Sequence, residues 1–184
     1  MKKRALAILG LGLPLAFGLG TLLRAGQEAS SVEDRAQAVR YARELEANPF
    51  GAEAASKRTW LMKWIVAAPD ITVVVCDLLG PGPQGEHPFF KEVLSQMMFS
   101  NGAFQIEHPD QVRDKVAVQT AGLEGALKVY EILVKSKPEG RLPFLDDLLV
   151  KRAEGHLVEY VTTQTAICDK VKGHPVGPGA PHGL

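Results

Sequence analysis

The densest group of side chains able to carry chemistry lies in the middle of the chain and comprises Glu107, His108, Asp110 and Asp114. Carboxylates and imidazole bind divalent metal ions and transfer protons, so one hypothesis is a metal-binding protein or a metal-assisted hydrolase. A structural interpretation is simpler. Pro109 keeps His108 out of helical geometry, and the aspartates suit the positive first turn of a following helix. We prefer the structural interpretation, because one short polar turn is a weak motif.

A second group combines basic and aromatic side chains. Trp60 and Trp64 are four residues apart and share a helix face, and Lys57, Arg58 and Lys63 lie beside them. Such a face can approach an anionic membrane surface or an anionic ligand. An apolar stripe of this kind is more often part of a core, with basic side chains reaching the solvent around it. We favour the core interpretation here too.

A third group is apolar and contains Met97, Met98, Phe99 and Phe104. Adjacent methionines adapt to irregular surfaces, which suits either a core or a binding face. We interpret the group mainly as core. Together with the two tryptophans, these residues are also the candidates for an apolar helix face that binds a partner or for a small apolar pocket.

The two cysteines, Cys76 and Cys168, predict a disulfide. An even pair in an exported protein is more often bridged than free. The chain has no C-x-x-C or C-x-x-C-H motif, and two cysteines alone cannot complete a structural zinc site. The expected bridge would join a third helix to the last one.

Signatures of catalysis are missing from the sequence. We find no Walker A loop, no G-x-G-x-x-G, no H-E-x-x-H, no G-x-S-x-G and no EF-hand pattern. We therefore expect a non-catalytic protein and predict no cofactor.

The first 25 residues predict a signal peptide. Lys2, Lys3 and Arg4 precede an uncharged apolar run over residues 5–23, and small residues follow it. The run is long enough to span a bilayer, so a retained membrane anchor is the alternative. We expect a periplasmic or secreted protein whose partner is another envelope or secreted protein, with membrane contact only if the segment is retained.

Charge argues against a nucleic-acid partner. The chain has 21 basic and 21 acidic side chains, and the leader contains four of the basic ones and none of the acidic ones. The remaining part is mildly acidic, without the basic footprint that nucleic acid requires. Roughly 150 residues follow the leader, which is an ordinary length for one domain.

Helix start and stop signals predict an all-α fold, a single bundle-like domain over residues 30–172. Ser30 and Glu33 have the spacing of a capping box, and prolines mark several later starts. The segment 71–75 is β-branched and suits a strand, but its Pro-Asp start favours a short buried helix. The expected helices, about seven in number, are 31–47, 50–67, 70–79, 88–106, 110–136, 143–153 and 156–171.

Apolar stripes define the inner faces of the last long helices. The stripe of the longest helix has small residues beside it that allow a second helix to approach closely, and consists of Val112, Val116, Leu123, Leu127, Tyr130 and Val134. The stripe of the final helix points Cys168 inward. The Gly-, Pro- and His-rich tail, residues 173–184, cannot form a core and is expected to be disordered or extended.

These observations lead to one preferred function and two alternatives. The leading hypothesis is an exported, non-catalytic protein that binds another macromolecule through an apolar helix face. The first alternative is the metal site around His108. The second is a carrier of a small apolar ligand, with a pocket near Phe99 and Phe104.

Overall fold

The protein is predominantly α-helical, as predicted. The computed structural model describes residues 29–80, 87–170 and 174–176. The predicted signal peptide lies outside these residues. In chain order the elements are α1 (Val32–Ala47), α2 (Ala54–Ala67), β1 (Val73–Val75), α3 (Phe90–Glu107), α4 (Lys115–Ser136), a short 3-10 helix η1 (Pro138–Gly140), α5 (Pro143–Ala153), α6 (Leu157–Lys170) and β2 (His174–Val176).

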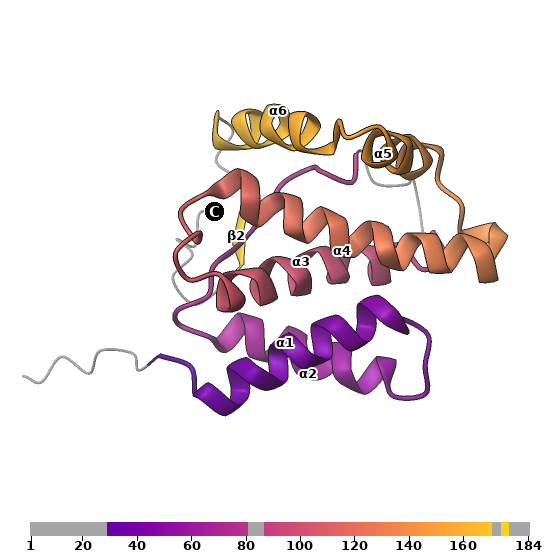
Figure 1. Ribbon diagram of the computed structural model, residues 1–184. Helices are drawn as coiled ribbons and strands as arrows, with labels where there is room; N and C mark the ends of the chain where they lie inside the picture. Colours follow the sequence, from indigo (N-terminus) through magenta and orange to yellow (C-terminus); the bar gives the residue numbers. More distant parts are fainter. Residues whose placement is uncertain (1–28, 81–86, 171–173, 177–184) are drawn as a thin grey trace, which may run out of the picture.

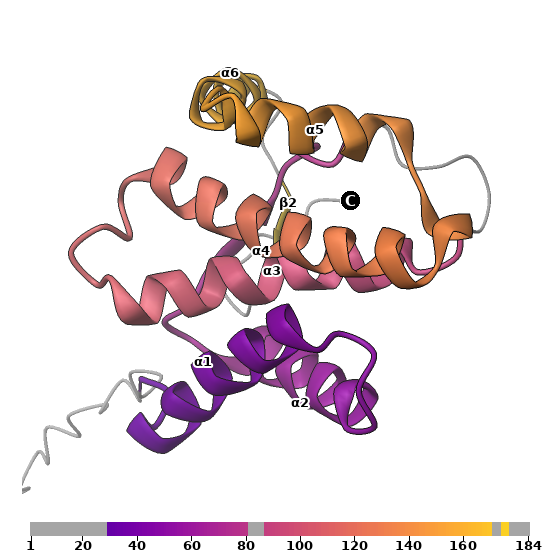
Figure 2. The ribbon, with the colours of Figure 1, turned by 45° about the vertical axis from the view of Figure 1, so that its right-hand side comes forward.

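The six helices form three layers of two (Figure 1). Helices α3 and α4 form the middle layer, α1 and α2 cover one side of it, and α5 and α6 cover the other. A view turned by 45° shows the same stacking (Figure 2). Among the described residues, no helix is long and apolar enough to cross a membrane.

Helix starts follow local capping chemistry. The Ser31 side chain accepts a hydrogen bond from the Asp34 N–H at 3.0 Å and caps α1. Asp114 caps α4 in the same way, accepting from the Ala117 N–H at 3.0 Å. The predicted start of that helix at residue 110 was therefore five residues early, because Asp114 rather than Asp110 is the cap.

The predicted helix at 70–79 is wrong. Val73–Val75 forms β1, which pairs antiparallel with β2 and places Val74 opposite Pro175. The β-branched side chains suit a strand, and the partner strand comes from the segment predicted to be a disordered or extended tail. That tail therefore begins, at residues 174–176, with a paired strand, and residues 177–184 lie outside the described part. Loss of this one helix explains why the described residues form six α-helices rather than the expected seven.

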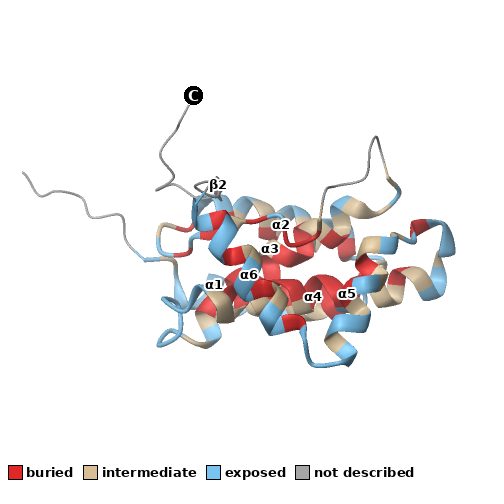
Figure 3. Cartoon of the chain, turned by 90° about the horizontal axis from the view of Figure 1, so that it is seen from above, coloured by how far each residue is buried: buried red, intermediate tan, exposed pale blue. Residues whose placement is uncertain are grey.

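Two apolar cores lie between the layers. One is built by α1, α2 and α3 around Leu61 and Phe99. The other is built by α3, α4, α5 and α6 around Leu127 and Tyr130. Figure 3 shows the buried residues on the inner faces of the helices and the exposed residues on the outside. Of the predicted stripe of the longest helix, Val112 precedes α4 and is exposed, whereas the others are buried or half-buried.

Small residues in α4 let it approach α3 closely, as predicted. A Cβ atom added to Gly122 would lie 2.8 Å from the Met97 carbonyl oxygen. A Cβ atom on Gly125 would overlap the side chain of Ser100. The contact of the two central helices therefore depends on these two positions having no side chain.

Candidate functional site

The strongest candidate site is a polar cavity of about 370 Å³ that lies between β1, α3, α4 and α6. We call it the polar cavity. It lies next to the disulfide, and each of the four elements contributes lining residues. Its polar lining consists of Asp70, Thr72, Asn101, Gln105, Lys115, Gln119, Thr165 and Asp169.

Helix α3 contributes Asn101 and Gln105, which are one helical turn apart and both buried. The Gln105 amide nitrogen donates to the Asn101 side-chain oxygen at 2.8 Å and to the Thr72 carbonyl at 3.0 Å. These two bonds attach α3 to the chain that leads into β1. The two side chains therefore form a fixed wall of the polar cavity.

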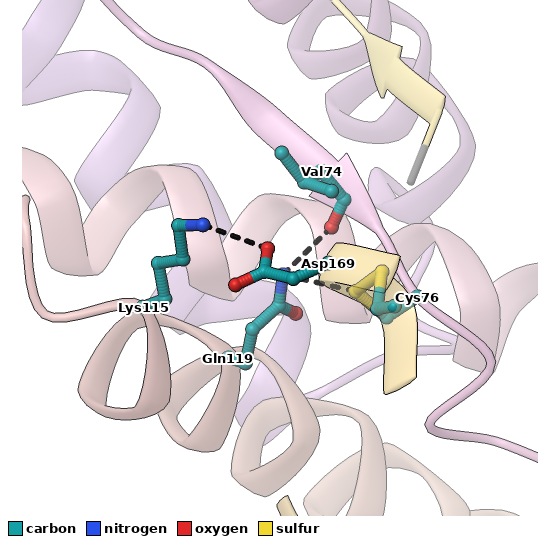
Figure 4. Close-up of a disulfide and its surroundings, with 6 residues drawn as sticks. Val74, Cys76, Lys115, Gln119 and Asp169 are labelled. Atoms are coloured by element: carbon teal, nitrogen blue, oxygen red, sulfur yellow. Dashed lines mark hydrogen bonds and ion pairs between the residues drawn. A yellow bond between two sulfur atoms is a disulfide. The ribbon is translucent and has the colours of Figure 1, made fainter. Parts of the chain in front are cut away.

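Gln119 on α4 reaches across to the strand (Figure 4). Its amide nitrogen donates to the Val74 carbonyl at 2.9 Å and lies 3.8 Å from the Cys76 sulfur. A carbonyl can only accept, so it holds the amide with its nitrogen toward the strand. The amide oxygen of Gln119 is buried, and it has no hydrogen-bond partner among the described residues.

Thr165 on α6 provides the second polar atom of the lining residues that makes no hydrogen bond in the described part of the chain. Its neighbours Thr162 and Thr163 donate to the carbonyls of Val158 and Glu159, at 2.8 and 3.1 Å. The Thr165 hydroxyl is buried without any partner in the described part of the chain, and the residue is 6% exposed. Thr165 thus does not make the bond to a carbonyl of the preceding turn that Thr162 and Thr163 make.

The charges at the edge of the polar cavity are already compensated. Lys115 on α4 and Asp169 on α6 form an ion pair at 2.7 Å, drawn in Figure 4. Asp70 forms an ion pair with Arg35 of α1 and accepts from the Ser30 N–H at 3.2 Å. The polar cavity therefore has no uncompensated charge of its own.

The predicted bridge between Cys76 and Cys168 is present, with the two sulfurs 2.09 Å apart and the Cα atoms 5.7 Å apart. It joins α6 to the end of β1 and not, as predicted, to a third helix. Because Cys168 is three residues after Thr165, the bridge holds α6 against the strand where the polar cavity forms. The disulfide thus fixes the part of α6 that carries Thr165.

Three of the four predicted metal-binding residues make contacts within the fold. Glu107 pairs with Arg43 at 2.5 Å, and the His108 ring lies 4.5 Å from the ring of Phe104, measured between centroids. Asp114 caps α4, and Asp110 is exposed in the turn before it. In residues 29–80, 87–170 and 174–176, no group of three or more His, Cys, Asp or Glu could hold a metal ion.

The residues of the predicted binding face are buried or half-buried. Trp60 and Trp64 stack with centroids 6.1 Å apart and, half-buried, pack on the core between α1, α2 and α3. Met97 and Phe99 are buried, while Met98 and Phe104 are half-buried. Phe99 is also in the lining of a second cavity, between α2 and α3.

The polar residues of the site were missed, although the sequence has a signal for them. Gln119 lies on the apolar stripe of α4, three residues after Val116 and four before Leu123. Thr165 occupies the equivalent gap in the stripe of α6, four residues after Val161. A polar residue in an apolar stripe predicts a buried hydrogen bond or a site.

The polar cavity combines neutral hydrogen-bonding groups with an apolar lining from Val74, Val112 and Val118. Amides and a hydroxyl orient a polar molecule well, and they are weak acids, bases and nucleophiles. This composition suits binding. Comparison of the chain with protein-family models, with curated proteins and with solved structures found no match.

Proposed function

We propose that this chain is an exported, non-catalytic binding protein that holds a small polar molecule in the polar cavity. One observation carries the proposal: the side-chain oxygens of Gln119 and Thr165 are buried and have no hydrogen-bond partner among the described residues. A buried polar atom left unpaired costs about 1–3 kcal/mol. A ligand that bonds both oxygens recovers this energy, which gives the site its affinity.

The lining also defines the class of ligand. The free Gln119 oxygen can only accept, so the ligand needs at least one N–H or O–H group, while the Thr165 hydroxyl can donate or accept. The compensated charges at the edge favour an uncharged or zwitterionic molecule. A volume of about 370 Å³ lies at the small end of ligand sites. Sugars, polyols, amino acids and small amides fit this description.

Export is part of the proposal. It is supported by the charge and hydropathy pattern of residues 1–25, and by a disulfide of the kind that persists in oxidising compartments. Fractionation of the native host should find the protein outside the cytoplasm and shortened by about the length of a signal peptide. A full-length product found only in the cytosol contradicts this part.

The binding experiment uses calorimetry of the protein that lacks residues 1–25 with a monosaccharide, a polyol, an amino acid and a small amide. The test variant is Thr165→Val, which keeps the shape and removes the hydroxyl. We expect it to abolish binding while leaving the free energy of unfolding unchanged or raised, because the lost hydroxyl had no partner. Thr162→Val on the same helix is the matched control and should bind normally.

Two results would overturn the proposal. If the native protein and Thr165→Val bind every ligand with equal affinity, the ligands bind outside the polar cavity. The second result is that the native protein binds none of these ligands and that no small molecule can be extracted from protein purified from its host. The polar cavity then contains only water.

A macromolecular partner remains a second hypothesis for the same protein. It has less support, because Met97 and Phe99 of the proposed apolar face are buried in the core. A pull-down from the host envelope, read by mass spectrometry, tests it.

A further inference from the structure

A second cavity, of about 440 Å³, lies between α2 and α3, and it shares no lining residue with the polar cavity. We call it the α2/α3 groove. Its apolar floor includes Met62 of α2 and Phe99 of α3. Phe99 is 1% exposed and lies beneath the surface of this floor, so the half-buried Met62 provides the part of it that solvent reaches. An apolar floor that is open to solvent favours a ligand with a hydrocarbon part.

Basic side chains surround this floor. Lys63 and Arg58 come from α2 and Lys91 from α3, whereas Glu92 is the only acid in the lining. Within the described part of the chain, Lys63 and Lys91 make no ion pair, although many other basic residues do. The α2/α3 groove therefore has an excess of positive charge that no described carboxylate neutralises.

Two atoms in the lining lack partners. Arg58 donates one guanidinium N–H to the Pro49 carbonyl, while its Nε is buried without a partner among the described residues. The Oε2 atom of Glu92 is buried and also lacks one there. Burial lowers the pKa of Arg58, and the nearby charge of Glu92 raises it. Arg58 is thus a partly desolvated cation with donor capacity to spare.

We propose that the α2/α3 groove binds a single-chain anionic amphiphile, a fatty acid or a molecule of the same chemistry. Its acyl chain lies on Met62, above the buried Phe99, and its carboxylate lies among Lys63, Lys91 and Arg58. Charge complementarity selects the anion, and the apolar floor selects the chain.

Calorimetry with decanoate, below its micellar concentration, tests the proposal directly. Decanoate should bind with about one molecule per protein, and each added methylene should raise the affinity by up to about fourfold until the groove is full. Decyltrimethylammonium, which has the same chain and the opposite charge, should bind at least about tenfold more weakly. Equal binding of the two amphiphiles would contradict a site selected by charge.

Charge reversal supplies the variants. Lys63→Glu combined with Lys91→Glu should weaken decanoate binding by about tenfold or more, because two attractions become repulsions. Lys135→Glu combined with Lys151→Glu is the matched control, since it changes net charge equally at exposed positions outside the groove. An equal loss of affinity in both double variants would show only a general effect of net charge.

The direction in which Glu92→Gln changes the affinity for decanoate tests most directly whether the ligand is an anion. Glu92→Gln should tighten decanoate binding, because it removes the one repulsive carboxylate. Weaker binding would mean that the ligand donates to Glu92, and the anion hypothesis would be wrong. If the protein cosediments with phosphatidylglycerol vesicles but does not bind decanoate, the α2/α3 groove binds a membrane surface and not a single amphiphile. This result would also overturn the proposal.

This site is independent of the proposed function. Thr165→Val, which removes the hydroxyl from the polar cavity, should leave decanoate affinity unchanged. The failure of one proposal therefore leaves the other standing.

Discussion

Glu46 is the buried charge on which the packing of α1 against the central layer depends. The residue is 6% exposed, and its carboxylate accepts from Ser100 at 2.7 Å, Lys128 at 2.8 Å and Arg43 at 2.5 Å. Burial alone would raise the pKa of Glu46, but these partners together lower it below the ordinary value of 4.5. The ionised form is therefore the one that the fold stabilises.

Stability should depend on pH through this carboxylate. Because the pKa of Glu46 is lower in the folded state than in the unfolded state, its contribution is complete above pH 4.5 and is lost as the pH falls through the folded value. Glu46→Gln should remove this part of the acid dependence and lower the free energy of unfolding at neutral pH by about 1–3 kcal/mol. Urea unfolding at a series of pH values measures both effects.

The control for this measurement is Glu154→Gln, since Glu154 is exposed and makes no ion pair among the described residues. It should shift neither the neutral stability nor the acid profile. An acid profile of Glu46→Gln identical to that of the native protein would show that other carboxylates control acid unfolding.

At the scale of elements, the close contact of α3 and α4 can be tested at Gly125. In an open helix, replacing glycine by alanine gains about 1 kcal/mol. Here the new methyl would overlap Ser100 and approach Glu46, so Gly125→Ala should instead lower the free energy of unfolding by about 1–3 kcal/mol. Thermal or denaturant unfolding measures the sign.

Gly102→Ala in α3 is the comparison. Its added methyl would meet the end of the Ile65 side chain at 3.0 Å, and that end can move. The loss should be clearly smaller than at Gly125. A stabilised Gly125→Ala would mean that the helices separate at little cost.

The pairing of β1 with β2 gives the tail a role that the sequence analysis did not assign to it. Deleting residues 173–184 removes β2 and the ladder to Val73–Val75. We expect the free energy of unfolding to fall by about 1–2 kcal/mol as those hydrogen bonds are lost.

Deleting only residues 177–184 retains β2 and isolates the effect of the strand. The two truncations should differ in thermal midpoint, with the longer one lower. Equal thermal midpoints of the two truncated proteins would show that β2 does not contribute to stability.

At the scale of the whole molecule, the Cys76–Cys168 bridge connects the outer layer to the strand and closes a long loop. Cys76→Ser and Cys168→Ser should each lower the free energy of unfolding by about 2–5 kcal/mol. The double variant should cost little more than either single one, because one bond cannot be lost twice. Titration of thiols in unfolded, unreduced native protein should find none, and two reactive thiols would contradict the bridge.

Local signals allowed most helices to be predicted. Capping side chains, prolines and apolar stripes act within a few residues, so α1, α5 and α6 were placed to within about two residues. The start of α4 was missed because two aspartates compete for the same cap. The segment 71–75 was misassigned because its β-branched side chains need a partner strand that no local window contains.

The candidate sites could not be predicted in the same way. Gln119, Thr165 and Gln105 come from three different helices, and only packing brings them around one cavity. Of the tryptophans and methionines predicted as binding residues, Met97 is in the core and the other three are half-buried against it, because the apolar character that suits binding also drives burial.

The sequence by itself determined the helical class, most helix ends and the pairing of the two cysteines, because each depends on local chemistry or on a choice without alternatives. Only the tertiary structure decided that β1 pairs with the C-terminal strand and that Glu46 is buried with its partners. It also decided that Gln119 and Thr165, whose side-chain oxygens lack partners among the described residues, line one cavity and that basic residues line another. These features arise from residues far apart in the chain, and their energies exist only once the layers have packed.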